Sequence, residues 1–217
     1  MIRVVIADDH TILREGLKQL LLASEDLTVV GEAADGHEVL REIRSREFDV
    51  LLLDMSMPGK SGMELIKQVK AERPKLRILV LSMHEEHQYA VRAIRSGASG
   101  YLTKESAATQ LVTAIRKVAG GGAFISAEVA EQLALSAMPH HAEGPPHVAL
   151  SDREYQVFRL LVEGTAVSEI AQKLNLSVKT VSTHKARLME KLAIDNAPDL
   201  VRYAMKHGLS DDPNQSQ

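Results

Sequence analysis

The stretch Asp49-Val50-Leu51-Leu52-Leu53-Asp54 decides the fold of the first part of this 217-residue chain. Its four consecutive apolar side chains predict a strand that is buried on both faces, because neighbouring side chains of a strand point to opposite sides. Strands of this kind are typical of parallel sheets that carry helices on both faces. The stretch therefore predicts an α/β domain.

The same kind of segment recurs along residues 1–122, with helical stretches between the strands. The other short β-rich apolar runs are Arg3–Ala7, Leu27–Glu32, Arg77–Leu81 and Gly100–Thr103. The amphipathic helical stretches are Ile12–Ala23, Glu38–Arg46, Gly62–Glu72, Gln88–Ser96 and Ala107–Ala119. This strict alternation predicts a doubly wound, five-stranded parallel sheet of the flavodoxin-like kind.

A glycine run, Gly120-Gly121-Gly122, interrupts this pattern, and a further helix is predicted over Ala127–Ala137. Three prolines and a glycine within 138–147 predict a linker without regular structure, whose three histidines are solvated. We therefore divide the chain into a domain over 1–122, a helix and Pro-rich linker over 123–147, a domain over 148–211 and a tail over 212–217.

The region after the linker predicts helices only. Ser151-Asp152-Arg153-Glu154 has the pattern of a capping box and begins a helix that ends near Val162. A short helix over Ser168–Leu174 and a longer one, capped by Ser177 and ending near Leu192, have the proportions of a helix-turn-helix. A last helix runs from Pro198 to His207. We expect a small all-α domain.

Composition and charge narrow the classes of function. The chain has no cysteine, which excludes disulfides and thiolate metal sites. It lacks a run of about 18 apolar residues, and acids follow the first apolar residues too early for a signal peptide, so we expect a cytoplasmic protein without membrane contact. The net charge is −3, but 148–209 carries 9 Lys and Arg against 7 Asp and Glu. This asymmetry indicates two different tasks.

Five polar residues follow or end the predicted strands: Asp8, Asp9, Asp54, Ser82 and Lys104. In an open α/β sheet the carboxyl ends of the strands meet at one edge, which is where ligands bind. Three carboxylates at one place repel one another unless a cation joins them, and oxygen ligands favour a hard ion such as Mg²⁺. A carboxylate is also a nucleophile for phosphoryl groups, with Lys104 and Ser82 available for the phosphate oxygens.

These positions lie in segments that resemble the receiver domain of two-component response regulators. The resemblance covers residues 2–120 and is carried by Ala7-Asp8-Asp9-His10, Leu53-Asp54-Met55-Ser56-Met57-Pro58-Gly59, Leu81-Ser82-Met83, Gly97-Ala98 and Gly100-Tyr101-Leu102-Thr103-Lys104.

The resemblance implies a role for each matching residue. Asp54 would accept a phosphoryl group from a sensor histidine kinase, and Lys104 would contact the phosphate. Asp8, Asp9, Asp54 and the backbone carbonyl of Ser56 would bind Mg²⁺. Ser82 and Tyr101 would be the switch residues that respond to the phosphate, with the ring turning inward. Ser56 and His84 are near enough to influence the lifetime of the phosphoryl group.

The longer helix of the second domain presents a polar face opposite its apolar one. Val181, Leu188 and Leu192 cluster on one side in a helical projection, as expected for packing on the domain. The predicted DNA contacts are Lys179, Thr180, Ser182, Thr183, Lys185, Ala186 and Arg187. The cations suit phosphates, which position a protein without specifying a sequence, and Ser182, Thr183 and Ala186 suit base edges in a major groove.

This region is similar to the LuxR-type DNA-binding domain, on Leu150-Ser151, Arg153-Glu154, Glu169-Ile170-Ala171, Lys179-Thr180-Val181, His184 and Lys191-Leu192. Joined to a receiver, it has the layout of NarL/FixJ-type response regulators. The resemblance implies double-stranded DNA with inverted half-sites, a homodimer on activation through the last helix, and RNA polymerase as a further candidate partner. Val167 and Ser168 depart from the family pattern, which weakens one expected phosphate contact.

Two other functions compete with this interpretation. Aspartate-based phosphatases also place a nucleophilic Asp after a parallel strand, but their signature is Asp-x-Asp on the first strand, whereas this chain has adjacent Asp8-Asp9. A phosphorylation-independent regulator would use the first domain only for protein contacts, and it would have no physical need for the charge cluster. We therefore predict a transcription regulator and not an enzyme.

Overall fold

The computed structural model describes residues 1–57, 62–83, 87–136 and 145–209. Five strands form one sheet in the order β2-β1-β3-β4-β5, and every neighbouring pair is parallel. The strands are β1 (Ile2–Ala7), β2 (Leu27–Ala33), β3 (Val50–Asp54), β4 (Arg77–Ser82) and β5 (Gly100–Thr103). The predicted five-stranded parallel sheet is confirmed.

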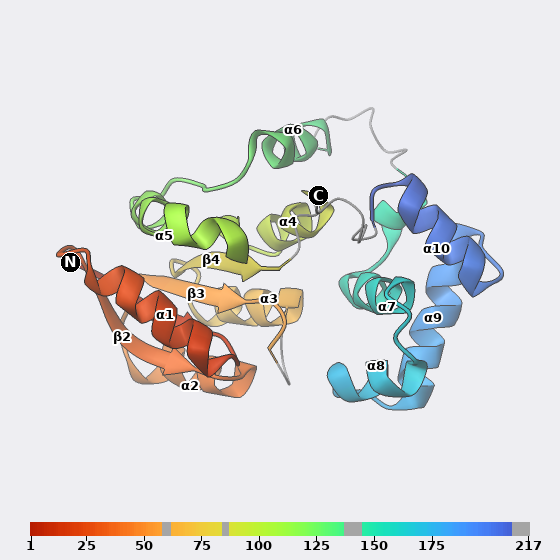
Figure 1. Cartoon of the computed structure of the whole chain (residues 1–217), viewed down its shortest axis with the longest axis horizontal. Coiled ribbons are helices and arrows are strands. Elements are labelled where there is room, and N and C mark those ends of the chain that lie inside the picture. The colour runs from red at the N-terminus through yellow and green to blue at the C-terminus, as the bar shows by residue number, and fades with distance from the viewer. Residues whose placement is uncertain (58–61, 84–86, 137–144, 210–217) are drawn as a thin grey trace. The chain divides into compact units, whose positions relative to one another are not determined.

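One helix follows each strand, and the helices form a layer on each face of the sheet (Figure 1). These helices are α1 (Thr11–Leu22), α2 (Gly36–Ser45), α3 (Gly62–Glu72), α4 (His87–Arg95) and α5 (Lys104–Ala119). Side chains of α1 and α5 pack with β1, β3, β4 and β5 in one apolar core. Helices α2, α3 and α4 contact one another in a row. The whole of β3 is buried, as the apolar stretch predicted.

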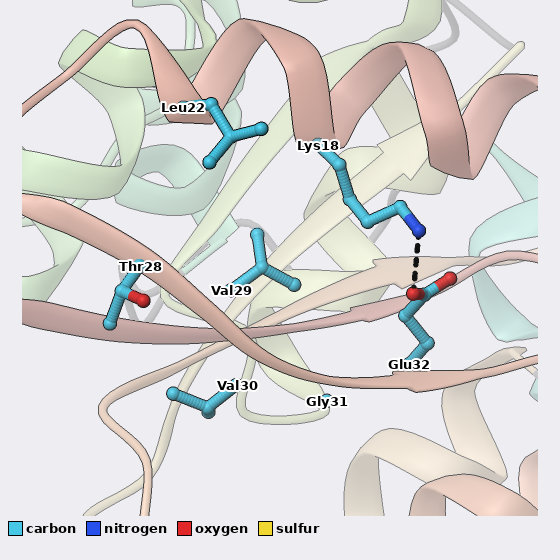
Figure 2. A pocket seen from close by; sticks show the side chains of 7 residues that line it. All are labelled: Lys18, Leu22, Thr28, Val29, Val30, Gly31 and Glu32. Atoms are coloured by element: carbon cyan, nitrogen blue, oxygen red, sulfur yellow. Dashed lines mark hydrogen bonds and ion pairs between the residues drawn. The ribbon is translucent and has the colours of Figure 1, made fainter.

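Helix α1 is also tied to the edge strand β2 by charge. Lys18 Nζ lies 2.7 Å from a carboxylate oxygen of Glu32, at the mouth of a pocket of about 350 Å³ (Figure 2). The pocket is lined by α1 and β2 and shares no lining residue with the polar strand ends. We assign this ion pair to the packing of α1 on the sheet.

Two helices begin earlier than the periodicity predicted, because side chains cap them. Asp35 accepts hydrogen bonds from the backbone N–H groups of His37 and Glu38, so α2 begins at Gly36. Thr103 caps α5 in the same way, and this helix begins at Lys104, directly after β5. The early start of α5 holds Lys104 in a first helical turn and not in a loop.

The first unit of the chain extends beyond the predicted boundary at residue 122. Tyr101 N–H donates to the carbonyl of Phe124 (2.8 Å), and the Phe124 ring packs against the sheet core. A side chain on Gly100 would place its Cβ 2.9 Å from that same carbonyl oxygen, so this close approach needs a glycine. The chain divides into compact units at Ala134/Leu135, which places most of α6 (Ala127–Ser136) in the first.

The second unit is helical, as predicted. It contains a short 3-10 helix, η1 (Pro146–Ala149), followed by α7 (Asp152–Val162), α8 (Val167–Lys173), α9 (Val178–Leu192) and α10 (Ala197–Lys206). Its core is formed by buried apolar side chains of these helices: Tyr155, Val157, Phe158, Ile170, Ala171, Val181, Leu188, Leu192, Leu200 and Ala204. The predicted capping box of α7 is present, and Gly208 ends α10 at a φ of 65°.

One prediction for the linker is wrong. His147 is 1% exposed and not solvated, because η1 turns its ring into the second unit. Its Nδ1 lies 2.9 Å from the hydroxyl of Tyr203 on α10, and its ring contacts that of His207 edge to face. Buried polar rings need such partners. The other two linker histidines, His140 and His141, lie outside the described residues.

Candidate functional site

The parallel register brings the polar strand ends to one edge of the sheet. Asp54 pairs with Leu81 and Ser82 pairs with Thr103, so that the last residues of β3, β4 and β5 are level. Ala7 at the end of β1 pairs with Leu53, which sets the following Asp8 beside Asp54. The sequence predicted this gathering at the carboxyl edge, and the structure shows it.

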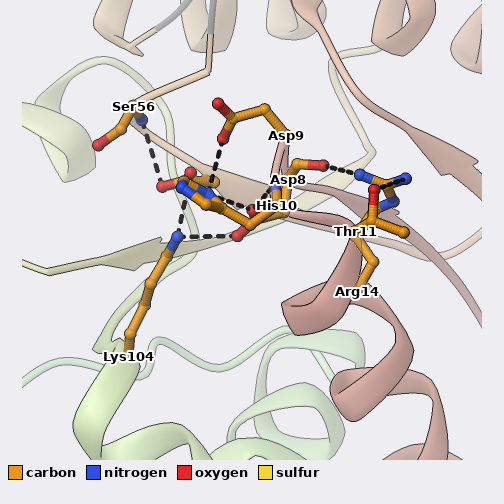
Figure 3. Close-up of polar contacts among 8 residues, drawn as sticks. Asp8, Asp9, His10, Thr11, Arg14, Ser56 and Lys104 are labelled. Atoms are coloured by element: carbon orange, nitrogen blue, oxygen red, sulfur yellow. Dashed lines mark hydrogen bonds and ion pairs between the residues drawn. The ribbon is translucent and has the colours of Figure 1, made fainter.

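Lys104 joins the two buried carboxylates at this edge (Figure 3). Its Nζ lies 2.8 Å from Asp8 Oδ2 and 3.1 Å from Asp54 Oδ2. The side chains of Asp8 and Asp54 are 1% and 0% exposed, and that of Lys104 is 9% exposed. A pair so far from solvent interacts strongly, and either partner left alone would be a buried, uncompensated charge.

Burial and charge shift the titration of both partners. Burial raises the pKa of Asp54 above its usual value, and the negative charge of Asp8 adds to that effect against the opposing effect of Lys104. Burial alone would lower the pKa of Lys104, but its hydrogen bond to Asp8 and the charge of Asp54 outweigh it and raise the pKa. Lys104 is therefore held as a cation, while burial disfavours the charged form of Asp54.

Asp9 and His10 complete a cluster that has the donor atoms of a cation site. Asp8, Asp9, His10 and Asp54 each offer one ligand atom, and these atoms lie within 4.8 Å of one another. Three carboxylates against one ammonium leave two negative charges uncompensated, which fits a divalent ion with oxygen ligands. The residues therefore fit Mg²⁺. The analysis of the sequence did not predict that the His10 ring joins the acidic cluster.

Backbone groups hold the two aspartates of the site in place. Ser56 N–H donates to Asp54 Oδ1 over 3.2 Å, and His10 N–H donates to Asp8 Oδ1 over 2.8 Å. Arg14 of α1 donates to the backbone carbonyl of Asp8 over 2.6 Å. Figure 3 shows the contacts of His10 and Arg14 with Asp8 at the loop after β1. The role of Arg14 could not be predicted from the sequence. A basic residue at this position looks like any other charged residue on an amphipathic helix.

The two predicted switch residues, Ser82 and Tyr101, are buried on β4 and β5, beyond β3. Ser82 is 0% exposed at the end of β4, and Tyr101 on β5 is 8% exposed. The ring therefore points into the protein and not into solvent. His84, which was expected to influence the lifetime of a phosphoryl group, lies outside the described residues, as do Pro58 and Gly59.

Helices α8 and α9 form the predicted helix-turn-helix in the second unit. The turn passes through Asn175, whose φ is 52°, and Leu176 N–H donates to the carbonyl of Ala171 over 2.8 Å. Ser177 caps α9 by accepting from Thr180 N–H over 3.0 Å. The cap satisfies one of the free N–H groups at the beginning of α9.

The face of α9 that was predicted to contact DNA is largely exposed. The exposed side chains among the predicted contacts are Lys179, Ser182, Thr183, Ala186 and Arg187, and the half-buried ones are Thr180 and Lys185. Two hydroxyls on this face already have partners within α9. Thr183 Oγ1 donates to the Lys179 carbonyl over 3.0 Å, and Thr180 Oγ1 lies 2.8 Å from Ser177 Oγ. Ser182 is therefore the better candidate for a base contact.

An ion pair between the buried Glu154 and the 40% exposed Lys191 links α9 to the start of α7. Lys191 Nζ donates to Glu154 Oε2 over 2.7 Å, and the Glu154 side chain is 5% exposed. The same carboxylate accepts from Ser151 N–H in the capping box. Burial alone would raise the pKa of Glu154, but the hydrogen bond from Lys191 outweighs it and lowers the pKa. The sequence identified the capping box but not its partner 37 residues later.

Comparison with known families agrees with this division of the chain. Residues 4–116 match the response regulator receiver domain, and residues 148–204 match the bacterial regulatory proteins of the luxR family. The response regulator UvrY of Escherichia coli K12 is 36% identical over 209 residues, which cover 96% of each chain. The response regulator GacA of Pseudomonas aeruginosa is 36% identical over 97% of this chain and 99% of its own.

Solved structures of similar proteins include RcsB of Salmonella. RcsB of Salmonella enterica serovar Typhimurium, bound to promoter rprA with the phosphomimetic BeF₃⁻, has a TM-score of 0.69 at 33% identity. The match covers 94% of this chain and 99% of that one. A structure of an RcsB–DNA complex matches with a TM-score of 0.58 at 33% identity, over 94% of this chain and 98% of that one. Among the residues described for this chain, no helix has the length and apolar character to cross a membrane.

Proposed function

The chain belongs to the response regulators of the NarL/FixJ type, and we propose that it is switched by a phosphoryl group on Asp54 to bind DNA. Proteins of this family regulate transcription and are not enzymes. The observation that supports the proposal is the buried Asp8–Lys104–Asp54 contact, because it pairs the phosphoacceptor with the cation that its product needs.

The proposed reaction is transfer of a phosphoryl group from a phosphohistidine of a sensor kinase. An oxygen of the Asp54 carboxylate forms a bond to phosphorus, the bond from phosphorus to the imidazole nitrogen breaks, and that nitrogen retains the electron pair. Catalysis of such a transfer consists mainly of positioning and of compensating charge. Ser56 N–H orients Asp54. The Lys104 ammonium group, which now contacts Asp54, would contact the new phosphate oxygens instead.

Asp8, Asp9, Asp54 and the Ser56 carbonyl are the residues that we propose to hold Mg²⁺. The ion would supply positive charge to the phosphate oxygens during transfer. The fold buries the carboxylates of Asp8 and Asp54 and leaves that of Asp9 32% exposed. Arg14 holds the Asp8 backbone, so the two neighbouring aspartates are presented in a fixed direction.

The switch that we propose uses Ser82 and Tyr101. Phosphorylation adds about −1.5 to −2 charge and strong hydrogen-bond acceptors at the sheet edge. The Ser82 hydroxyl would donate to the phosphate, and the Tyr101 ring would occupy the space behind it. The buried ring supports this arrangement, and the population of the active form would rise with the new contacts.

The proposed output is binding of inverted DNA half-sites by a homodimer. The domain over 148–211 would place α9 in the major groove, with Lys179, Lys185 and Arg187 at phosphates and Ser182 and Ala186 at base edges. Helix α10 would form the dimer contact, and phosphorylation would shift the population toward the dimer. A dimerisation constant that phosphorylation does not change would contradict this version. RNA polymerase is a further candidate partner, and the proposed location is the cytoplasm.

The first experiment is intact-mass measurement after incubation with acetyl phosphate and Mg²⁺. Wild type is expected to gain one phosphoryl group, and Asp54→Asn none. Asp49→Asn is the matched control, because Asp49 lies at the opposite end of β3 and pairs with Arg3. Absence of an adduct on wild type would overturn the phosphoryl switch and support the phosphorylation-independent regulator. Equal adducts on wild type and Asp54→Asn would assign the reaction to another residue.

A further inference from the structure

The His10 ring is a polar group of the receiver site that the proposed function does not use. Its Nδ1 lies 3.1 Å from Asp8 Oδ1 and 3.0 Å from Asp9 Oδ1. The single Nδ1 atom therefore lies close to an oxygen of each of the two neighbouring carboxylates. Asp8 turns its other oxygen, Oδ2, toward Lys104, so the two side-chain partners of this carboxylate bind different oxygens.

The spacing of these atoms matches the ligands of an octahedral ion. At a bond length of about 2.1 Å, adjacent ligands of an octahedron lie about 3 Å apart. The Nδ1 atom has this separation from two carboxylate oxygens, and the ligand atoms of Asp8, Asp9, His10 and Asp54 all lie within 4.8 Å. A cation bound here can therefore contact Nδ1 with little movement of the ring.

Chemistry also allows the ring to change from donor to ligand. Without a metal, an Nδ1–H group can donate to Asp8 Oδ1, whereas coordination needs the lone pair on Nδ1 and the proton on Nε2. The His10 side chain is 66% exposed, so water can solvate that relocated N–H group. The exchange of tautomers consequently leaves no buried donor without a partner.

We propose that His10 is a nitrogen ligand of the cation site and makes it favour the later first-row transition metals, such as Ni²⁺, over Mg²⁺. This inference rests on the proposed metal site of the receiver. Carboxylate and carbonyl oxygens suit Mg²⁺, whereas imidazole nitrogen favours transition metals, with affinity rising from Mn²⁺ to Ni²⁺. A site of oxygen atoms alone would show a weaker preference of this kind.

The competing explanation is that His10 only closes the turn before α1. Its backbone N–H donates to Asp8 Oδ1 over 2.8 Å, and this bond brings the ring near the carboxylates without any ligand role. The two explanations differ in one observable, which is nitrogen bonded to the metal. A spectroscopic measurement on the full chain therefore decides between them.

The experiment is pulsed electron paramagnetic resonance of the full chain with one equivalent of Mn²⁺. We expect ¹⁴N modulation from a directly bound imidazole in wild type, and its loss in His10→Asn. Because the chain has nine histidines, the signal is assigned to this site only if excess Mg²⁺ displaces it and Asp9→Asn removes it. His37→Asn, at an exposed histidine of α2, is the matched control and should retain the modulation.

Calorimetric titrations with Ni²⁺ and Mg²⁺ provide the second measurement. His10→Asn is expected to weaken Ni²⁺ binding about tenfold or more and to change Mg²⁺ binding by less than about threefold. Equal changes for both ions, or wild-type Mn²⁺ without ¹⁴N modulation, would overturn the inference. Formation of the phosphoryl adduct with Mg²⁺ is a separate readout. If wild type forms it while His10 shows no ligation, the proposed function stands and only the inference fails.

Discussion

The receiver site and the exposed face of α9 are built in opposite ways. The receiver site takes Asp8, Asp54, Ser82 and Lys104 from positions at or directly after the ends of four different strands, and it holds the charges of Asp8, Asp54 and Lys104 in buried contact. The face of α9 takes its polar residues from one continuous helix and leaves most of them exposed.

This difference predicts how each region responds to substitution. Groups that share a buried network interact, so the loss of one changes the others, whereas separate exposed groups contribute nearly independently. The receiver site should therefore respond as a unit and α9 residue by residue. The five substitutions below test that contrast.

The largest effect is expected for Lys104→Met. Asp8 and Asp54 would remain as two buried carboxylates without their cation, and the free energy of unfolding should fall by about 3 kcal/mol. Urea denaturation at neutral pH in EDTA measures the loss, and added Mg²⁺ should restore part of it. Lys75→Met is the control, because Lys75 is exposed in the same unit. Equal effects of the two variants would show that the Lys104 contacts contribute no net stability.

Glu154→Gln tests the ion pair between the buried Glu154 and Lys191 in the second unit. Loss of the charge that accepts from both Lys191 and Ser151 N–H should lower the free energy of unfolding by about 2 kcal/mol at neutral pH. Because the folded protein holds the pKa of Glu154 below 4.5, this stability is present above pH 4.5 and is lost as the pH falls through the folded pKa. Thermal melting at pH 7 and pH 3 should show a smaller acid effect in the variant than in wild type. Glu190→Gln, an exposed acid of α9, should behave as wild type.

Asp54→Asn should stabilise the metal-free protein by an amount on the order of 1 kcal/mol, the usual size for one substitution. Burial raises the pKa of Asp54 above 3.8, so the folded state binds its proton more tightly than the unfolded state does. Wild type consequently loses stability as the pH rises from 3.8 through the folded pKa, and the variant does not. Urea denaturation in EDTA from pH 3 to pH 7 measures the difference between the two proteins. A variant that is less stable than wild type at pH 7 would contradict the expectation.

The smallest effects belong to α9, where single contacts are tested on DNA. Arg187→Ala should weaken binding to every sequence and reduce the slope of log affinity against log salt by about 1, because one phosphate contact is lost. Ser182→Ala removes no charge, so the slope should stay the same while discrimination between base pairs falls. Fluorescence anisotropy at several salt concentrations measures both. The effect of the double variant should equal the sum of the effects of Arg187→Ala and Ser182→Ala. A different result would contradict the expectation that residues of α9 contribute independently.

The sequence allowed most of the fold to be predicted, because the elements with strong periodicity also form locally. The apolar run of β3 and the alternation of strands and helices predicted the sheet, and the Ser151–Glu154 capping box was found where it was expected. The beginning of α5 was missed. Its periodic apolar residues start one turn after Thr103, and the cap that extends the helix is a local hydrogen bond.

Contacts between residues far apart in the chain could not be predicted in the same way. His147 was expected in a solvated linker because prolines surround it, yet Tyr203, 56 residues later, provides the partner for its burial. The pairing of Lys191 with Glu154 has the same character. Neither residue type nor spacing carries information on such a contact.

By itself, the sequence predicted which polar residues gather at the strand ends, since side-chain type and position relative to the strand ends follow from local patterns. Only the tertiary structure decided how those groups act on one another. The register of the sheet sets Lys104 between Asp8 and Asp54, and the turn before α1 brings His10 to Asp8 and Asp9. The physical reason is that charge interactions depend on distance and burial, which arise only when separate strands pack together.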